Sequence, residues 1–488
     1  MVVGAGLGGL AAAARLAATG HDVTVCEAAA EVGGKLGWVS RDGFGFDTGP
    51  SLVTLPQVFE DLFAATGAPL SEVLDLVRLD PAVAYRFADG TRLAVPGRLA
   101  DIPAAVDAAL GSGDQWAALL ERAEQVWRVT EQPFLRSELQ GPRTLARLAR
   151  SAADVRTVAP WLSLRALGSR YLTDPRLQVL LDRYATYSGS DPRRAPAALV
   201  TVPWVEQAFG SWYVRGGLRR LALAVADRAV ERGAVLHTST PVTGVLVAGG
   251  RAAGVQLADG GRLPADVVVS NADAAALYAD LLPAGAPVRR ARVTLSRATA
   301  SSSGFVLLLA LHGRTPDLAH HTVLFPADYD AEFDGLFDSP RPLADPTVYV
   351  SAPDDPATRP DAGSEAWFVL VNAPRHRPGE GVDWDAPGLA DSYADRVLAV
   401  LAERGLDVRD RVRWREVRTP ADLERATGSV GGSIYGTSSN GARAAFLRPA
   451  NASPLPGLFL VGGSAHPGGG LPLVALSAEI VAGLIGPA

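Results

Sequence analysis

The stretch Gly4-Ala5-Gly6-Leu7-Gly8-Gly9 follows the apolar pair Val2-Val3 and precedes an alanine- and leucine-rich run that predicts a helix over Leu10–Thr19. The alternating residues Asp22–Ala28 then predict a strand. Strand, glycine-rich turn, helix and strand in this order predict a β-α-β unit, and the turn fits the G-x-G-x-x-G pattern. This pattern is typical of turns that bind a dinucleotide.

Each glycine of the turn has a separate task. Gly4 permits the tight turn, Gly6 lets the backbone approach a pyrophosphate, and Gly9 allows the helix to pack closely on the strand. The free N–H groups at the helix N-terminus attract phosphates. Glu27 ends the second strand, where its carboxylate can accept hydrogen bonds from a ribose diol. We therefore predict a dinucleotide site; the alternative is a plain glycine-rich turn with a solvated glutamate.

The composition excludes several classes of protein. Of the 488 residues, 48% are hydrophobic and 20% are charged, which is typical of globular chains. The net charge of -6 disfavours a nucleic-acid partner, because such proteins are usually basic. The single cysteine, Cys26, excludes an intrachain disulfide, and we expect it to be buried. The histidines show no metal-ligand spacing, so we expect no metal site.

The sequence predicts a cytoplasmic protein that attaches to the inner face of the cell membrane. No run reaches the roughly 18–20 apolar residues that cross a bilayer, and the N-terminus lacks the regions of a secretory signal. Between Arg136 and Arg170, seven arginines alternate with leucines and with Trp161. Such a mixture suits a helix on an anionic lipid surface. The alternative is a solvated basic face.

Further elements follow from periodicity and turn residues. The segment from Ile102 to about Leu181 is mainly helical in pattern, and glycine turns join short strands between residues 235 and 270. The predicted hairpin, sheet strands and C-terminal strand and helix are Tyr85–Val95, Phe305–Leu311, Thr347–Ser351, Trp367–Asn372, Gly457–Val461 and Leu473–Ile485.

Two runs after the first β-α-β unit narrow the cofactor. Gly33-Gly34-Lys35 and Asp47-Thr48-Gly49-Pro50 resemble the flavoprotein group of amine oxidases, protoporphyrinogen oxidases and carotenoid desaturases. The resemblance implies that the first run lies near the pyrophosphate and that the second reaches toward the flavin. A second dinucleotide fingerprint is missing from the sequence, so we expect FAD and no built-in NAD(P)H site.

The C-terminal run GLFLVGGSAHPGGGLPLVALSA, residues 457–478, is similar to the signature of the bacterial phytoene-desaturase-like family of carotenoid desaturases and isomerases. Three further runs resemble that family: Arg183–Pro196, Trp212–Leu218 and the stretch from Thr419 to Gly436. The likeness spans essentially the whole chain. Lys35 and Val214 stand where the family commonly has arginine and proline.

The resemblance implies an α/β fold in three parts. A Rossmann-type FAD-binding domain of the amine-oxidase and carotenoid-desaturase group comprises residues 1–75, 205–275 and 440–488. An inserted α+β substrate domain comprises residues 76–100 and 276–439. A helical, membrane-facing region spans residues 101–204. The cofactor-binding residues implied are Gly4, Gly6, Gly9, Glu27, Gly34, Lys35, Gly49, Pro50, Val242, Gly462, Gly463, Pro472 and Leu473.

The family implies desaturation of a carotenoid-type polyene by hydride transfer to flavin N5, with a quinone or O2 as electron acceptor. Hydride loss from an allylic carbon leaves a cation spread over the polyene, so a weak base or water suffices to take the proton. His466 is the candidate base, and the alternative is that it shapes the turn. Pro472 opens the last predicted helix. The candidate substrate channel consists of Trp204, Trp212, Tyr213 and Tyr187, and the alternative is ordinary core.

The sequence motifs are also compatible with other functions. A redox-neutral cis-trans isomerase, a saturase or an oxygenase of the same family would share these motifs. An amine oxidase is disfavoured because Lys35 is the sole lysine and lies beside the expected pyrophosphate, whereas many amine oxidases place a lysine against flavin N5. A flavin-binding protein without catalysis is the remaining alternative.

Overall fold

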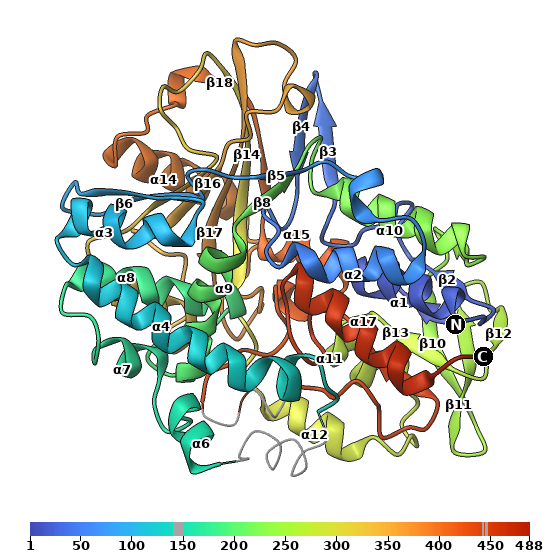
Figure 1. The fold of residues 1–488 in the computed structure, drawn as a ribbon. Helices are drawn as coiled ribbons and strands as arrows, with labels where there is room; N and C mark the ends of the chain where they lie inside the picture. Colours follow the sequence, from blue (N-terminus) through green and yellow to red (C-terminus); the bar gives the residue numbers. More distant parts are fainter. Residues whose placement is uncertain (140–150, 442–443, 445–447) are drawn as a thin grey trace.

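The computed structural model describes residues 1–139, 151–441, 444 and 448–488 (Figure 1). Two sheets organise it, one near both chain termini and one on the opposite side of the molecule. The helices between residues 102 and 209 lie along the side of these two parts.

The first sheet is parallel and combines strands from distant parts of the chain. Its order is β19-β13-β1-β2-β9. These strands are β1 (Val2–Val3), β2 (Thr24–Cys26), β9 (Val235–His237), β13 (Val268–Ser270) and β19 (Leu458–Leu460). Val2 of β1 pairs with Val25 on one side and Val269 on the other, so the short first strand is central. Cys26 is buried, as predicted.

Helix α1 (Leu7–Ala18) is the centre of this part. It packs against α10 (Arg219–Glu231), α17 (Leu471–Ile485) and α2 (Pro56–Thr66). The run Ala11–Ala14 is fully buried, because small side chains let the helices approach closely. The helix begins three residues earlier than predicted, since Leu7 already belongs to its first turn.

The second sheet has seven strands in the order β18-β14-β17-β16-β15-β6-β7. They are β6 (Val83–Arg86), β7 (Arg92–Val95), β14 (Ser303–His312), β15 (His321–Leu324), β16 (Val348–Ser351), β17 (Ser364–Ala373) and β18 (Val412–Arg418). Helix α14 (Leu389–Glu403) shares a core with this sheet that contains Trp367, Trp384 and Tyr393. The hairpin and three strands agree with the sequence prediction, whereas β15, β18 and α14 were not predicted.

The helices along the side of the two sheets comprise α3 (Ile102–Leu110), α4 (Gly113–Thr130), α6 (Ala152–Val158), α7 (Leu164–Gly168), α8 (Pro175–Arg183) and α9 (Thr201–Phe209). Smaller pieces are β3 (Trp38–Arg41), β4 (Phe44–Asp47), β5 (Leu76–Arg78), β8 (Trp212–Val214), α11 (Ala274–Ala276), α12 (Arg289–Arg297), α13 (Asp330–Phe333) and α15 (Pro420–Thr427). The three-stranded sheet consists of β10 (Val242–Ala248), β11 (Arg251–Leu257) and β12 (Arg262–Pro264). Among the described residues, none of the helices combines the length and apolar character that crossing a membrane requires.

Candidate functional site

The glycine-rich turn forms a close-packed cradle at the start of α1. Gly6 is the residue before the helix and pairs with Gly33 through a backbone bridge. A Cβ atom on Gly9 would lie 2.1 Å from the carbonyl oxygen of Gly4, so only glycine fits there. The predicted need for close packing at Gly9 is thus confirmed. No side chain of the described residues caps the helix, which leaves its first N–H groups available to an anion.

Asn271 lies beneath this turn and was not predicted. It follows β13, and its side chain reaches both glycine-rich turns of the chain. A Cβ atom on Gly6 would lie 2.5 Å from Asn271 Nδ2, and one on Gly462 would lie 2.5 Å from Asn271 Oδ1. The sequence feature that could have identified Asn271 is its position, since it is a polar residue directly after a buried strand of the same sheet.

Glu27 supports the turn from the next strand. Its carboxylate oxygens accept hydrogen bonds from the backbone N–H groups of Ala5, at 2.6 Å, and of Ala29, at 2.8 Å. Each oxygen keeps a lone pair for a ribose hydroxyl. The carbonyl of Glu27 accepts from Thr240 N–H, two residues before Val242, which begins β10 half-buried. Val242 therefore begins the strand that follows this contact with Glu27.

The second glycine run packs against the first. A Cβ atom on Gly34 would lie 3.2 Å from the Cα of Gly6, and one on Gly49 would lie 2.0 Å from the carbonyl oxygen of Lys35. Asp47 accepts hydrogen bonds from Leu218 N–H and Arg219 N–H at the start of α10, and burial raises the pKa of its carboxyl to about 6. These contacts bring Gly34, Lys35, Gly49 and the adjoining Pro50 to the cradle.

Lys35 lies at the cradle through its backbone, but its ammonium points elsewhere. Nζ donates to the carbonyl oxygens of Ile434, at 2.7 Å, and Ser433, at 3.2 Å. Loss of solvent lowers the pKa of Lys35 to about 8, while the charge of Asp273 opposes this shift. The side chain thus fastens the cradle to the C-terminal part of the chain, a contact that sequence reasoning did not predict.

Arg448 is a second cation of the site that the sequence did not single out. Its guanidinium donates to the carbonyl oxygens of Gly463 at 2.7 Å, Tyr435 at 2.9 Å and Thr437 at 2.7 Å. Burial lowers its pKa to about 10, again against the charge of Asp273. Two cations beside one carboxylate leave positive charge near the glycine turns, which suits an anionic cofactor.

The C-terminal turn faces the first cradle. Gly462, Gly468 and Gly470 have φ angles of 98°, 145° and 105°, a region that favours glycine. Gly463 adjoins Gly462. Helix α17 starts at Leu471, so Pro472, which was predicted to open this helix, is its second residue, and Leu473 follows. Its N-terminus has no side-chain cap from the part of the chain that the structure describes, which leaves N–H groups for a ligand.

His466 anchors the C-terminal turn through one ring nitrogen, while its buried Nδ1 has no hydrogen-bond partner among the described residues. Nε2 lies 2.8 Å from the carbonyl oxygen of Phe134 and 3.0 Å from that of Ser137, so this nitrogen carries the proton. The ring packs edge-on against Phe134. Burial lowers the pKa of His466 to about 4. The imidazole therefore holds the C-terminal turn against the segment that follows α4.

The four aromatic residues of the predicted channel do not form one group. Trp204 packs against Trp127 and Phe209, and Trp212 donates to the carbonyl oxygen of Phe209. Tyr213 instead contacts His320, and its hydroxyl donates to Asp355 at 3.1 Å. The structure therefore places Tyr213 at a separate cavity, described below.

Tyr187 belongs to a buried polar cluster. Its hydroxyl and that of Tyr184 donate to the two carboxylate oxygens of Glu206, at 2.6 and 2.8 Å. Arg183 lies within 6 Å of the rings of Tyr85, Tyr184 and Tyr187. A charged group in such a desolvated aromatic setting is a feature of functional sites. The predicted channel included Tyr187, whereas Glu206 and Tyr85 were not predicted to belong to a site.

The basic segment differs from the prediction of an interfacial helix. Arg136 pairs with Glu131 and Arg165 pairs with Asp182 and Asp330, so both charges are already compensated. Leu139, Leu164 and Leu167 are buried in the protein core and cannot contact lipid. Arg143, Arg147 and Arg150 lie outside the described residues. Trp161 is 61% exposed, and Arg156 and Arg170 are also exposed.

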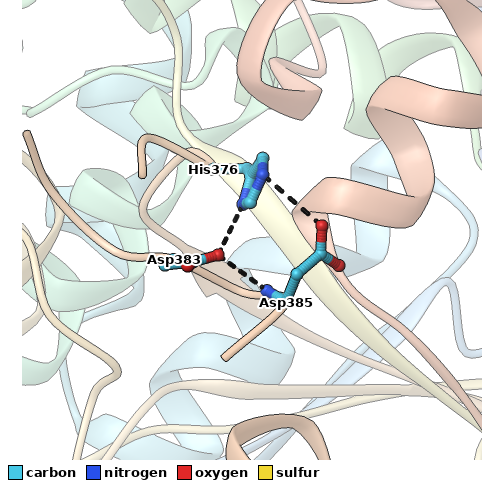
Figure 2. Close-up of side chains that lie close together, drawn as sticks. All are labelled: His376, Asp383 and Asp385. Carbon is cyan, nitrogen blue, oxygen red and sulfur yellow. Dashed lines mark hydrogen bonds and ion pairs between the residues drawn. The ribbon is translucent and has the colours of Figure 1, made fainter. Parts of the chain in front are cut away.

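A histidine and two aspartates gather on the loop after β17 (Figure 2). His376 Nε2 lies 3.7 Å from Asp385, and Nδ1 accepts the backbone N–H of Trp384 at 3.1 Å. Arg425 donates to both carboxylate oxygens of Asp385, at 2.8 and 3.0 Å. The atoms that would bind a cation already have partners, so we interpret the cluster as an ion-paired loop.

Comparisons with known proteins agree with this geometry. A family model described as flavin containing amine oxidoreductase matches residues 7–485. The chain is 37% identical to a hydroxyneurosporene desaturase of Rubrivivax gelatinosus, over 99% of this chain and 92% of the relative. It is 34% identical to a 4,4'-diapolycopene oxygenase of Methylomonas sp, over 99% of this chain and 96% of the relative. A solved putrescine oxidase bound to putrescine shares the fold, with a TM-score of 0.67 at 16% identity and coverage of 99% and 98%.

The cradle, the carboxylate of Glu27 and the two cations fit FAD, and the family match confirms this cofactor. The relatives confirm the resemblance to carotenoid-desaturase-like enzymes that the sequence motifs indicated. The chain therefore belongs to the flavin-containing amine oxidoreductase family and is an FAD-dependent oxidoreductase.

Proposed function

We propose that this protein is an FAD-dependent desaturase of a carotenoid-type polyene. The observation that carries the proposal is the likeness to a hydroxyneurosporene desaturase over 99% of the chain, at 37% identity. The fit of the glycine cradle to a dinucleotide supports the same conclusion, because this chemistry needs a cofactor that accepts two electrons. The cradle binds the cofactor, so an enzyme that acts on a different polyene would have the same cradle.

Desaturation of a polyene does not require a strong acid or base from the protein. Bound flavin supplies the hydride acceptor. The positive charge left on an allylic carbon spreads over the polyene, so the neighbouring proton is lost readily. The chain holds the cofactor through the cradle and Glu27, and orients the substrate among apolar and aromatic side chains. His466 donates its Nε2 proton to two carbonyl oxygens and keeps the lone pair of its buried Nδ1, which its pKa of about 4 makes a weak base.

The location of Lys35 argues against amine oxidation. Its ammonium binds the carbonyl oxygens of Ser433 and Ile434, and it is the sole lysine of the chain. Oxygenation of a polyene is the second candidate, because a 4,4'-diapolycopene oxygenase is 34% identical over nearly the full length. The two reactions differ in product mass and are therefore separable.

The finer organisation is also part of this proposal. The parallel sheet would belong to the FAD-binding domain and the seven-stranded sheet to the inserted substrate domain, with the divisions at the residues given above. Peripheral attachment to the inner face of the cell membrane would give access to a water-insoluble substrate. The exposed Trp161 supports this attachment. A quinone or O2 would reoxidise the enzyme.

The test is incubation of the flavin-loaded protein with a panel of polyenes and a quinone, followed by mass analysis of the products. Desaturation removes two hydrogens, isomerisation changes no mass and oxygenation adds oxygen. We expect a product lighter by two hydrogens and a longer absorbance wavelength. A Gly9→Ala variant, which cannot form the cradle, is the control for non-enzymatic oxidation. Products of unchanged or increased mass alone would overturn desaturation.

A further inference from the structure

A line of hydrogen-bonding side chains leads away from the cradle. The hydroxyl oxygens of Ser51 and Tyr349 are 2.5 Å apart, and the Tyr349 hydroxyl lies 2.7 Å from Nδ1 of His321. Ser51 comes two residues after Gly49, which packs against the backbone of Lys35. Tyr349 and His321 lie on the neighbouring strands β16 and β15. The line therefore starts beside the cofactor site and enters the seven-stranded sheet.

A ring contact, in place of a hydrogen bond, extends this line to a cavity. The rings of His321 and His320 meet edge to face, with centroids 4.5 Å apart. His320 lines a cavity of about 330 Å³ together with Tyr213, Asp354 and Asp355. Asp354 is exposed, so this end of the line reaches the surface. Side chains from three separate segments thus connect the cofactor side of the sheet with a surface cavity.

Two buried nitrogen atoms in this line make no hydrogen bond to the described residues. Nε2 of His320 and Nε2 of His321 are both buried, and neither has a hydrogen-bond partner among the described residues. A buried polar atom without a partner is costly and calls for a functional explanation or a bridging water. A purely structural role would explain the bonds of Tyr349, but it leaves both Nε2 atoms unexplained.

We propose that Ser51, Tyr349, His321 and His320 form a proton relay between the reaction site and this cavity. The proposal rests on the proposed function, in which the substrate loses a hydride to the flavin and a proton from the neighbouring carbon. The two electrons leave with the hydride, so the substrate is oxidised and the cofactor is reduced. The remaining proton must leave an apolar interior.

The relay moves that proton without changing the number of protons on its groups, but His321 ends with its proton on Nδ1 and must return to the Nε2–H tautomer before the next turnover. As Ser51 Oγ gains the substrate proton, its own proton passes to the Tyr349 hydroxyl, and the tyrosine proton passes to Nδ1 of His321. His321 then releases its Nε2 proton toward His320 and the cavity. Hydroxyls both donate and accept, and imidazole can bind a proton on one nitrogen while releasing one from the other.

The electrostatics of the two histidines agree with a carrier role. Burial lowers the pKa of His320 to about 4, although Asp355 and Asp354 oppose the shift. Burial also lowers the pKa of His321 well below its usual range, and the charge of Arg183 adds to this effect. Both rings are therefore neutral at rest and retain a transferred proton only briefly.

The main variant is Tyr349→Phe, which removes the hydroxyl that joins Ser51 to His321. Its matched control is Tyr393→Phe, since the Tyr393 hydroxyl is also buried and has no partner among the described residues. In anaerobic single-turnover product formation with a polyene that the wild type accepts, we expect Tyr349→Phe to be slower by about 10- to 100-fold, the low end for proton-transfer groups. Tyr393→Phe should retain the wild-type rate.

A second variant tests the relay without relying on the folding of Tyr349→Phe. His320→Ala enlarges the surface cavity, so imidazole added to the solution can enter the vacated position. We expect slow product formation that imidazole restores in a saturable manner, with no restoration for Tyr349→Phe. In the resting protein, the ¹⁵N resonance of His321 Nδ1, identified with His321→Gln, should shift in Tyr349→Phe and stay unchanged in Tyr393→Phe.

The outcomes separate the relay from the proposed function. If the wild type forms product and both Tyr349→Phe and His320→Ala match its rate, the relay is wrong and desaturation stands. Slowing of His320→Ala that imidazole does not reverse would also count against the relay. If the wild type forms no product from any polyene, the proposed function fails and the relay fails with it.

Discussion

The carboxylate of Glu27 lies 2.6 Å from the backbone nitrogen of Ala5, inside the glycine-rich turn. Glu27, at the end of the second strand, therefore has a second role besides binding a ribose. It holds the turn in place before the cofactor arrives, while its other oxygen binds Ala29 N–H. One side chain thus links the shape of the turn to recognition of the ribose, which makes the site pre-organised.

Replacement of Glu27 by glutamine tests this link. One oxygen becomes an NH2 group that faces a backbone N–H donor, so one charge-assisted hydrogen bond is lost. Such bonds contribute about 1.5–3 kcal/mol, and we expect roughly 10- to 100-fold weaker FAD binding. Fluorescence titration of the apoprotein measures this change. Glu31→Gln is the control, because exposed Glu31 binds Arg219 instead of the turn, and it should bind FAD like the wild type.

Gly9→Ala tests the packing of the cradle. Its Cβ atom would lie 2.1 Å from the Gly4 carbonyl oxygen, a backbone atom that cannot rotate away. We expect the purified variant to lack flavin absorbance. Gly483→Ala is the matched control, since Gly483 lies exposed in α17 with open space around it. A folded Gly9→Ala protein with the wild-type flavin content would contradict the assignment of the cradle.

Much of the architecture was predictable because burial leaves a periodic pattern. The β-α-β unit, the hairpin Tyr85–Val95 and three strands of the second sheet follow from alternation, short apolar runs and glycine turns. Strand β18 escaped prediction because its sequence, VRWREVR, is rich in charge and lies at the sheet edge, where polar side chains remain in solvent. Strand β15 begins with a histidine, so its apolar part is too short to stand out.

The site was predictable where it depends on local backbone shape. Gly9 and Glu27 act within one β-α-β unit, and their spacing alone identifies them. Lys35 and Arg448 bind carbonyl groups far along the chain, and such contacts have no sequence period. The leucines of the basic segment illustrate the opposite error: Leu164 and Leu167 look interfacial in sequence but pack into the core.

His466 should make stability depend on pH. Its pKa of about 4 in the folded protein lies below its ordinary value near 6.5, so the folded state binds this proton less readily than the unfolded chain. The resulting stability is complete above pH 6.5 and is lost as the pH falls from 6.5 through 4, by up to about 3 kcal/mol. The free energy of unfolding of the wild type minus that of His466→Gln should fall over this range. Parallel curves would contradict the structural role.

Trp161 should contribute to attachment on lipid. The side chain is 61% exposed, and transfer of its ring into a membrane surface is worth about 2 kcal/mol, or roughly 30-fold in affinity. Trp161→Ser should weaken binding to anionic vesicles in a sedimentation assay by about this factor. Val230→Ser is the control, because Val230 on α10 is similarly exposed at 53%. Equal loss in both variants would place the lipid contact elsewhere.

Electron transfer out of the enzyme should not involve a nicotinamide. The sequence contains one dinucleotide fingerprint, at residues 4–9, and this turn binds FAD. After anaerobic bleaching of the flavin by a polyene, we expect a quinone to restore the oxidised absorbance spectrum, and O2 to do so when admitted. NADP+ should leave the spectrum bleached, because both nucleotides would require the same cradle. Restoration by NADP+ alone would reveal a second nucleotide site that lacks the glycine pattern, and the quinone assignment would then be wrong.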